Sequence, residues 1–307
     1  MNLKVKIGEL TLKNPVMPAS GTFGFGLEFK DIFDLKNLGA LVVKTITKNP
    51  RLGNRPPRVY EVSCGMINSI GLANPGWDYF REKILPQIKD LNDILILNIA
   101  GESVEEFQYL AREAQRFDEI KALELNVSCP NVSKGGIAFG TDLEALKQIV
   151  SSVRKIYSKT LIVKLTPNVT DITVYAKAAE NAGADALTLI NTFSGMVIDV
   201  KSKKPVLGNK HGGVSGPAIR PMAVKMVYDC FKAVSIPLIG VGGIDSKEAA
   251  LEFFLAGATA IQVGSQNFVE PGFMPRLIRE LGEYLREENI EGIAKLTGLA
   301  HRREENV

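Results

Sequence analysis

The chain has 307 residues, of which 45% are hydrophobic and 23% charged, and its formal net charge is +3. This composition is ordinary for a globular protein, and the scattered lysines and arginines form no basic block that would indicate nucleic-acid binding. The three cysteines, Cys64, Cys129 and Cys230, are too widely spaced for a CxxC pair. They argue against a disulfide framework, and against an iron–sulfur cluster or structural zinc held by this chain alone.

The amino terminus, MNLKVKIGELTLKNP, does not resemble a signal peptide, because no long apolar stretch follows its lysines. No apolar run approaches the roughly 20 residues that a membrane-spanning helix needs. We therefore expect a cytoplasmic protein with no membrane contact.

Short apolar runs alternate with segments of helical period along almost the whole chain, a pattern typical of parallel α/β architecture. The runs are continuously apolar, as expected for strands that are buried on both faces. The predicted core strands span Pro15–Ala19, Ala40–Lys44, Ile94–Ile99, Ala122–Val127, Thr160–Lys164, Ala186–Ile190, Pro237–Val241 and Ala260–Val263. They predict an α/β fold, a closed (β/α)8 TIM barrel in one domain over residues 1–307, with an open doubly wound sheet as the alternative.

Helix boundaries can also be predicted from the sequence. A capping-box pattern at Thr141 and Glu144 is expected to begin the helix whose apolar stripe runs over residues 143–153. The helix over Ile172–Asn181 is expected to end near Gly183.

Two stretches of the chain are longer than the loops that a minimal barrel needs. Residues 45–80 and 191–220 are rich in glycine and polar residues, and both follow predicted strand ends. We expect long βα loops there, and loops of this length in a compact domain are usually functional.

In a barrel of this kind the active site lies at the carboxyl ends of the strands. Read in chain order, the residues at these ends are Ser20, Lys44, Asn98, Asn126, Lys164, Asn191, Gly242 and Gly264. An ordinary loop start explains any single asparagine equally well, but buried strands that end repeatedly in Lys or Asn favour a bound polar ligand. Lys44 and Lys164 fit the neutralisation of anionic groups, and a Schiff-base lysine is the rival role.

The last two strand ends are rich in glycine, with VGGI at Val241–Ile244 and VGS at Val263–Ser265. Loops after strands seven and eight form the usual phosphate site of these barrels, where glycine lets backbone N–H groups approach the anion. GGVSG at Gly212–Gly216 would add further donors. The pattern predicts a ligand that carries a phosphate.

The sharpest local motif is NVSCPN, Asn126–Asn131, where a strand ends and the chain turns through Cys129. A thiol with an ordinary pKa of about 8.5 needs little help to act as a base or nucleophile near neutral pH. The alternative, a small buried hydrophobe, is our interpretation of Cys230, while Cys64 stays unassigned. Because the chain has only two histidines and no paired carboxylates at strand ends, we expect no metal site and no glycosidase chemistry.

Five landmarks occur in order: ASGTFG at Ala19–Gly24, VVKT at Val42–Thr45, INSIGLANPG at Ile67–Gly76, NVSCPN, and the paired glycine loops. Over nearly its whole length the chain resembles the catalytic subunit of a dihydroorotate dehydrogenase. Dihydropyrimidine dehydrogenases are similar but usually carry a histidine after Cys–Pro, where Asn131 stands here. The resemblance implies an FMN-dependent oxidoreductase that converts (S)-dihydroorotate to orotate in de novo pyrimidine biosynthesis.

The subclass follows from the same motifs. Membrane-bound, quinone-linked members carry an amino-terminal extension and a serine base, whereas the base position here is Cys129. GTFGFGLEF at Gly21–Phe29 and PRLGNRPPR at Pro50–Arg58 are most similar to the NAD-linked, B-type catalytic subunit. The resemblance then implies a homodimer core with a partner subunit that carries FAD and an iron–sulfur cluster and passes electrons to NAD, together a heterotetramer.

Alternatives stay open from the sequence alone. The enzyme could be the fumarate-linked soluble type, or another FMN barrel that acts on a pyrimidine. A Schiff-base aldolase that uses Lys44 or Lys164, and a non-catalytic assembly subunit, belong to other functional classes.

The resemblance also implies residue roles. Cys129 corresponds to the base that removes the proton from C5 of dihydroorotate, while hydride leaves C6 for FMN. The residues assigned to the substrate are Lys44, Asn68, Ser69, Ile70, Gly71, Leu72, Asn126, Asn131, Asn191 and Thr192. Those assigned to FMN are Ser20, Lys44, Thr45, Asn98, Asn126, Lys164, Ile190, Gly216, Gly242, Gly243, Gly264 and Ser265.

Overall fold

The computed structural model describes residues 2–127 and 140–301. Its centre is a parallel sheet of eight strands in the order β3-β16-β15-β10-β9-β8-β7-β4. The strands are β3 (Val16–Pro18), β4 (Leu41–Ile46), β7 (Leu95–Ile99), β8 (Ile120–Asn126), β9 (Thr160–Lys164), β10 (Ala186–Leu189), β15 (Leu238–Val241) and β16 (Ala258–Val263). Each corresponds to one predicted strand, with ends that agree within two residues.

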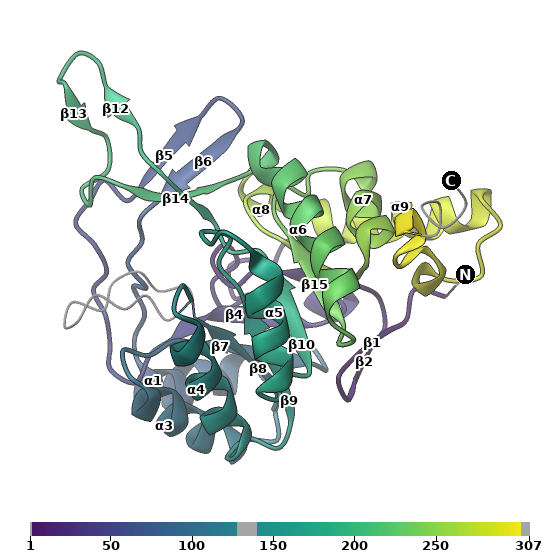
Figure 1. The fold of residues 1–307 in the computed structure, drawn as a ribbon, viewed down its shortest axis with the longest axis horizontal. Coiled ribbons are helices and arrows are strands. Elements are labelled where there is room, and N and C mark those ends of the chain that lie inside the picture. The colour runs from purple at the N-terminus through teal and green to yellow at the C-terminus, as the bar shows by residue number, and fades with distance from the viewer. Residues whose placement is uncertain (1, 128–139, 302–307) are drawn as a thin grey trace.

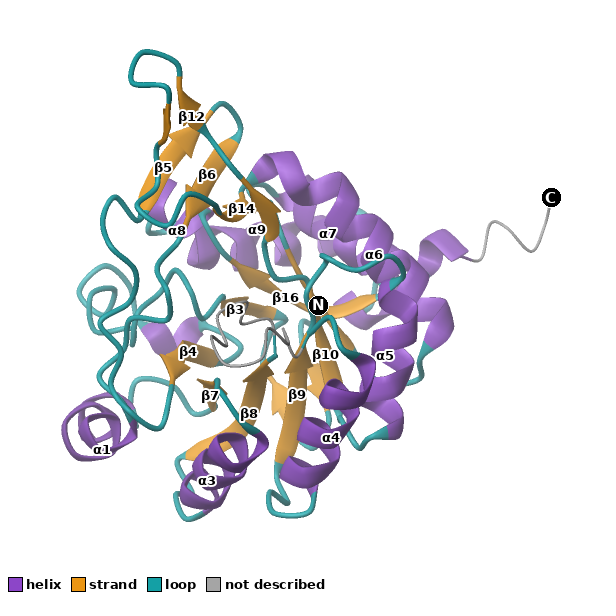
Figure 2. Cartoon of the chain, turned by 60° about the vertical axis from the view of Figure 1, so that its left-hand side comes forward, coloured by secondary structure: helices purple, strands orange, loops and turns teal. Residues whose placement is uncertain are grey.

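The sheet curls into a barrel. The edge strands β3 and β4 approach each other, and Gly39 N, just before β4, donates a hydrogen bond to Val16 O at 2.9 Å. Helices lie outside the ring of strands (Figure 2). The prediction of a (β/α)8 barrel is confirmed, and the open-sheet alternative is wrong.

The helices that cover the barrel have amphipathic faces. They are α1 (Trp77–Tyr79), α2 (Leu85–Ile88), α3 (Val104–Gln115), α4 (Leu143–Arg154), α5 (Ile172–Asn181), α6 (Arg220–Ala233), α7 (Lys247–Ala256), α8 (Gln266–Val269) and α9 (Phe273–Glu287), with a π-helical turn at Phe80–Ile84 and 3₁₀ turns at Leu35–Asn37, Pro217–Ile219 and Ile293–Leu296. In α3, for example, Phe107 and Leu110 are fully buried against the core. Among the described residues, no helix has the length and apolar character needed to cross a bilayer.

The predicted capping box of α4 is wrong. The residue that caps the helix is Asp142, whose carboxylate accepts a hydrogen bond from Ala145 N at 2.9 Å. Glu144 pairs instead with Lys147 at 2.7 Å. A carboxylate at the first position suits the positive end of the helix dipole, which explains why Asp142 takes this place. The end of α5 is as predicted, since Gly183 follows the C-cap with φ +103°.

The two long loops contain a second sheet that the sequence did not reveal. Its antiparallel strands, in the order β11-β14-β6-β5, are β5 (Val59–Val62), β6 (Gly65–Asn68), β11 (Phe193–Gly195) and β14 (Gly212–Ser215). A hairpin of β12 (Ile198–Asp199) and β13 (Lys204–Pro205) extends from it. This sheet projects from one end of the barrel (Figure 1) and joins the loop after β4 to the loop after β10.

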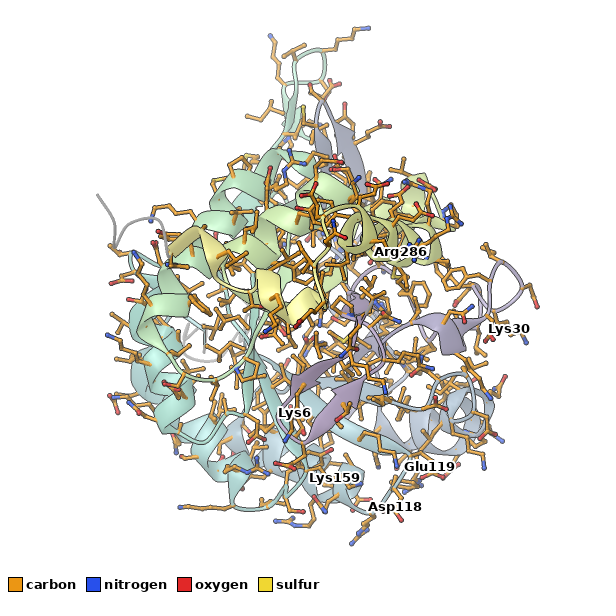
Figure 3. All side chains as sticks on the ribbon, turned by 90° about the vertical axis from the view of Figure 1, so that its right-hand side faces the viewer. Lys6, Lys30, Asp118, Glu119, Lys159 and Arg286 are labelled. Atoms are coloured by element: carbon orange, nitrogen blue, oxygen red, sulfur yellow. The ribbon has the colours of Figure 1, made fainter. Side chains whose placement is uncertain are left out.

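The opposite end of the barrel is closed. A hairpin of β1 (Val5–Ile7) and β2 (Leu10–Leu12) packs there, and Glu9 N donates to Thr160 Oγ1, at the start of β9, at 3.2 Å. Figure 3 shows Lys6 of this hairpin and Lys159 at this end of the molecule. The hairpin therefore covers the end of the barrel opposite the carboxyl ends of the strands.

Candidate active site

A bulge in β4 gathers the first group of candidate residues. Between the paired positions on either side, Lys44 and Thr45 of β4 face the single residue Asn98 of β7. Bulges are common next to active sites because they change the direction of a side chain. The structure therefore brings together three of the residues assigned to FMN.

Lys44 is half-buried, and its backbone N donates to Gly24 O at 2.8 Å, which attaches the ASGTFG segment to the strand end. Burial lowers the pKa of the Lys44 ammonium, and the negative charge of Glu28 partly offsets this effect. A cation in such a place is poorly solvated, so an anionic ligand group would stabilise it.

The next candidates lie at the ends of β8, β9 and β10. Asn126 pairs in register with Lys164, and Asn191 Nδ2 donates to Asn126 Oδ1 at 3.3 Å. Ile190 is 2% exposed, and its backbone N donates a hydrogen bond to Val241 O at 3.0 Å. This bond connects the end of β10 to β15. These contacts place the carboxamides of Asn126 and Asn191 side by side near a lysine.

Asn68 reaches the same region from the second sheet. Its Nδ2 donates to Gly213 O at 3.3 Å, and a Cβ built on Gly213 would lie 2.0 Å from Thr192 Oγ1. Gly213 is thus the residue that lets Asn68 and Thr192 approach each other. Asn168, after β9, steadies this loop by donating from Nδ2 to Thr192 O at 3.1 Å.

The segment Ser69–Leu72 is held by the preceding loop. Asn54 Nδ2 donates to Ser69 Oγ at 2.8 Å, and Asn54 N donates to Ile70 O at 3.1 Å. Gly71 has φ +71°, and a Cβ there would lie 2.6 Å from Asn54 N. Only glycine fits so close to this backbone.

Asn74 fixes the end of the same segment and is 8% exposed. Its Oδ1 accepts from Thr47 N at 3.2 Å and from Gly76 N at 2.9 Å. Its Nδ2 donates to Thr47 Oγ1 at 2.8 Å and to Leu72 O at 2.7 Å. One side chain thus ties the loop carrying the substrate candidates to the residues that follow β4.

The glycine loops form the second group. Gly243 has φ +71°, and a Cβ there would lie 2.7 Å from Gly216 O, so these two loops touch. A Cβ on Gly264 would meet no atom of the described residues within 4 Å, so among these residues nothing covers the backbone beside Ser265. Ser20 lies close by, because Ala19 N donates to Val263 O at 2.8 Å.

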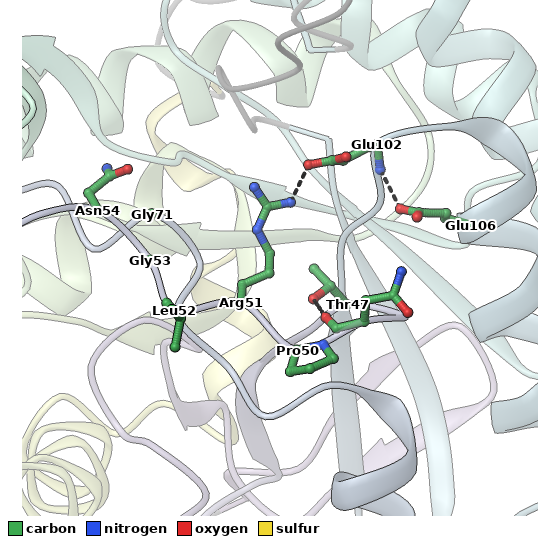
Figure 4. A pocket seen from close by; sticks show the side chains of 10 residues that line it. Thr47, Pro50, Arg51, Leu52, Gly53, Asn54, Gly71, Glu102 and Glu106 are labelled. Carbon is green, nitrogen blue, oxygen red and sulfur yellow. Dashed lines mark hydrogen bonds and ion pairs between the residues drawn. The ribbon is translucent and has the colours of Figure 1, made fainter.

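A polar cavity of about 530 Å³ borders the substrate segment at Gly71. Arg51 and Glu102 form an ion pair across it at 2.6 Å, and Glu102 N donates to the Glu106 carboxylate at 2.8 Å (Figure 4). The lining also includes Asn54. The cavity therefore lies on the outer side of the loop that contains the segment Ser69–Leu72.

Two predicted residues, Cys129 and Asn131, lie outside the described residues. Within residues 2–127 and 140–301, no group of three or more His, Cys, Asp or Glu side chains is placed to hold a metal ion.

Sequence reasoning missed the polar residues inside the barrel, above all Glu124 of β8 and Gln262 of β16, both of which are fully buried. A signal was present, because Glu124 precedes Asn126 by two positions and residues two apart share one face of a strand. The expectation of uniformly apolar strands does not include a buried glutamate at this position.

The parallel barrel, with lysines and asparagines at the strand ends and glycine loops after β15 and β16, has the architecture of a TIM-barrel enzyme. A family model described as dihydroorotate dehydrogenase matches residues 2–285. The chain belongs to this family, which confirms the resemblance seen in the motifs.

Curated relatives carry one description, "Dihydroorotate dehydrogenase B (NAD(+)), catalytic subunit". The protein of Carboxydothermus hydrogenoformans is 98% identical over 307 residues, which cover 100% of both chains. That of Thermoanaerobacter pseudethanolicus is 53% identical over 298 residues, 97% of this chain and 98% of the relative. That of Geobacter sp. strain M21 is 48% identical over 297 residues, 97% of each chain.

Proposed function

We propose that this chain is the catalytic subunit of an NAD-linked dihydroorotate dehydrogenase, which oxidises (S)-dihydroorotate to orotate in pyrimidine biosynthesis. The observation that carries the proposal is the convergence of Asn68, Asn126, Asn191 and Thr192 at the carboxyl end of the barrel in a member of this family. The descriptions of the relatives favour the NAD-linked type over the fumarate-linked alternative.

The residues present fit FMN. Gly264 leaves open space beside its backbone, as a phosphate cradle needs, and Gly216 and Gly243 allow two loops to meet there. Asn98 Oδ1 is buried and has no hydrogen-bond partner among residues 2–127 and 140–301, an arrangement that favours a ligand N–H donor. We propose that the FMN residues are those that the family resemblance assigned, from Ser20 to Ser265.

Bound FMN would supply the acceptor for the hydride that leaves C6 of dihydroorotate. The carboxamides of Asn68, Asn126 and Asn191 offer both donors and acceptors, so they suit a ring whose edge alternates N–H and C=O groups. Lys44 adds a positive charge for the carboxylate. Cys129 is proposed as the base at C5, where the adjacent carbonyl acidifies the proton.

The assembly is also a proposal. Relatives described as catalytic subunits imply a further subunit, and we infer that it carries FAD and an iron–sulfur cluster and joins a homodimer of this chain. We propose further that residues 1–307 form one FMN-binding domain. A cytoplasmic location stays a prediction from the sequence.

The catalytic assignment is tested by Cys129→Ala, with Cys64→Ala as the matched control because Cys64 is an exposed cysteine in the turn between β5 and β6. Loss of a general base should slow anaerobic flavin reduction by dihydroorotate about 100- to 10,000-fold, with FMN still bound. Cys64→Ala should reduce at the wild-type rate. A near-normal rate in Cys129→Ala would remove this residue from the proposed mechanism.

A further inference from the structure

Five polar side chains form a connected cluster inside the barrel, where side chains such as Val, Ile and Leu are usual. They are Asn98, Glu124, Lys164, Thr188 and Gln262, each from a different strand. Four of them are 0% exposed, and only Lys164, at 6%, has any exposed surface. The cluster therefore opens toward the site through Lys164.

Glu124 is the centre of this cluster. Its Oε1 accepts from Asn98 Nδ2 at 2.6 Å, and its Oε2 accepts from Thr188 Oγ1 at 2.8 Å and from Gln262 Nε2 at 2.6 Å. Every one of these neighbours is a donor. The arrangement thus suits a carboxylate, which only accepts hydrogen bonds.

Gln262 connects this carboxylate to the lysine. Lys164 Nζ donates to Gln262 Oε1 at 3.3 Å. An ammonium group can only donate, so the carbonyl oxygen of Gln262 must face Lys164 and its NH₂ must face Glu124. The orientation of one carboxamide is thereby determined from both sides.

Burying a carboxylate and two carboxamides in a barrel costs free energy that an apolar core would not. The cost is explained if the cluster serves the site. We propose that Glu124 and Gln262 are positioning residues that hold the Lys164 ammonium in place for the bound flavin. This inference rests on the proposed function, because it takes FMN as the ligand.

The placement of Lys164 supports a role toward the ligand. Its partner in register is Asn126, whose Oδ1 accepts from Asn191 at 3.3 Å, so the lysine ends beside the substrate carboxamides. A lysine side chain has four rotatable bonds, and an anchor at Nζ restricts them before the ligand arrives. Without the hydrogen bond from Lys164 Nζ to Gln262 Oε1, the free energy of FMN binding would include the entropic cost of ordering the lysine side chain.

Glu124→Gln tests the inference with little change in shape. The new NH₂ must face either Asn98 or Gln262, both of which present donors to it. If Gln262 turns over to accept from position 124, its own NH₂ faces the Lys164 ammonium, and that hydrogen bond is lost. Because a hydrogen bond to a charged group is worth about 10- to 100-fold in an equilibrium, the FMN dissociation constant should rise by about this factor.

The experiment measures the FMN dissociation constant from the quenching of flavin fluorescence as FMN is added back to the FMN-free full-length chain. The double variant Glu124→Gln with Gln262→Glu restores an acceptor facing Lys164 and a donor facing the new carboxylate, so affinity should return to within about threefold of wild type. In a Lys164→Met background, Glu124→Gln should change affinity by less than about twofold, since it acts through the lysine. Asp185→Asn, which removes a carboxylate bonded to Arg154 at the closed end of the barrel, is the control for general destabilisation.

A second variant, Gln262→Met, enters the same cycle with the same expected results, because it removes the acceptor of the Lys164 ammonium together with the donor from Gln262 to Glu124. The inference is overturned if Glu124→Gln and Gln262→Met both bind FMN as wild type does, or if either variant weakens binding equally with and without Lys164. Those results would leave the proposed function intact. A wild-type chain that fails to bind FMN would instead refute the proposed function, and this inference with it.

Discussion

Replacement of Asn74 by alanine should lower both the stability of the protein and its activity on dihydroorotate. The variant leaves two buried backbone donors, Thr47 N and Gly76 N, without acceptors. Each unsatisfied buried group costs about 1–3 kcal/mol, so the total loss is about 2–6 kcal/mol. At about 2.1 cal/mol/K per residue, 1 kcal/mol corresponds to about 1.5 °C in a chain of 307 residues, so the Tm should fall by about 3–9 °C.

Loss of the Asn74 side chain should also change the position of the substrate segment, because the Leu72 carbonyl accepts a hydrogen bond from Asn74 Nδ2 at 2.7 Å. Misplacement of a positioning loop by about 1 Å can cost up to about 100-fold in rate, so we expect kcat/KM for dihydroorotate to fall about 10- to 100-fold. The assay is steady-state kinetics on FMN-loaded protein, together with thermal unfolding.

Asn92→Ala is the matched control. Asn92 is 4% exposed, accepts from Ile94 N at 2.9 Å and donates to Leu35 O and Leu38 O, but it lies before β7, at the closed end of the barrel. It should lower the Tm comparably and leave kcat/KM unchanged. Equal kinetic effects in both variants, or an unchanged kcat/KM in Asn74→Ala, would show that Asn74 does not position the substrate segment.

Two further predictions concern the glycine loops and the cysteines. Gly243→Ala should raise the FMN dissociation constant at least about tenfold, because the residue has φ +71° and its new Cβ would lie 2.7 Å from Gly216 O and force the two loops apart. The control is Gly272→Ala, whose Cβ would meet no atom of the described residues within 4 Å and which should leave the dissociation constant unchanged. Equal FMN affinities of the two variants in a fluorescence titration would contradict this prediction. Burial raises the pKa of the Cys230 thiol to about 12, so at pH 8 only about one molecule in 10,000 carries the reactive thiolate. Mass spectrometry after iodoacetamide treatment at pH 8 should therefore find exposed Cys64 alkylated and Cys230 intact until denaturant is added, and labelling of native Cys230 would show that the prediction is wrong.

The barrel could be predicted because parallel strands buried on both faces are uniformly apolar. Each of the eight runs stands out from the helical segments beside it, and strand ends such as Lys164 follow directly. The residue at the end of a strand is then placed at the site by the fold alone. This is why the strand-end candidates needed no knowledge of side-chain contacts.

The second sheet could not be predicted, because its pairing joins segments that lie far apart in the chain. Asn68 and Gly213, which face each other in β6 and β14, are 145 residues apart, and the strands are short and rich in glycine. Neither segment shows an alternating pattern. Their role as a bridge between two loops appears only in three dimensions.

The positioning residues were hidden for another reason. Glu124 and Gln262 occupy inward positions of apolar strands, and Asn74 lies in a loop rich in Gly, Pro and Asn, where one more asparagine has no distinguishing feature. A single sequence shows residue types but not partners. What defines these residues is the number of hydrogen bonds that each one makes.

The central claim, a flavin in this barrel that dihydroorotate reduces, is tested most directly by the visible spectrum of the FMN-loaded chain before and after anaerobic addition of dihydroorotate. We expect a yellow protein whose flavin absorption bleaches at once. A flavin that stays oxidised would move the substrate elsewhere, and a chain that takes up no FMN would contradict the account.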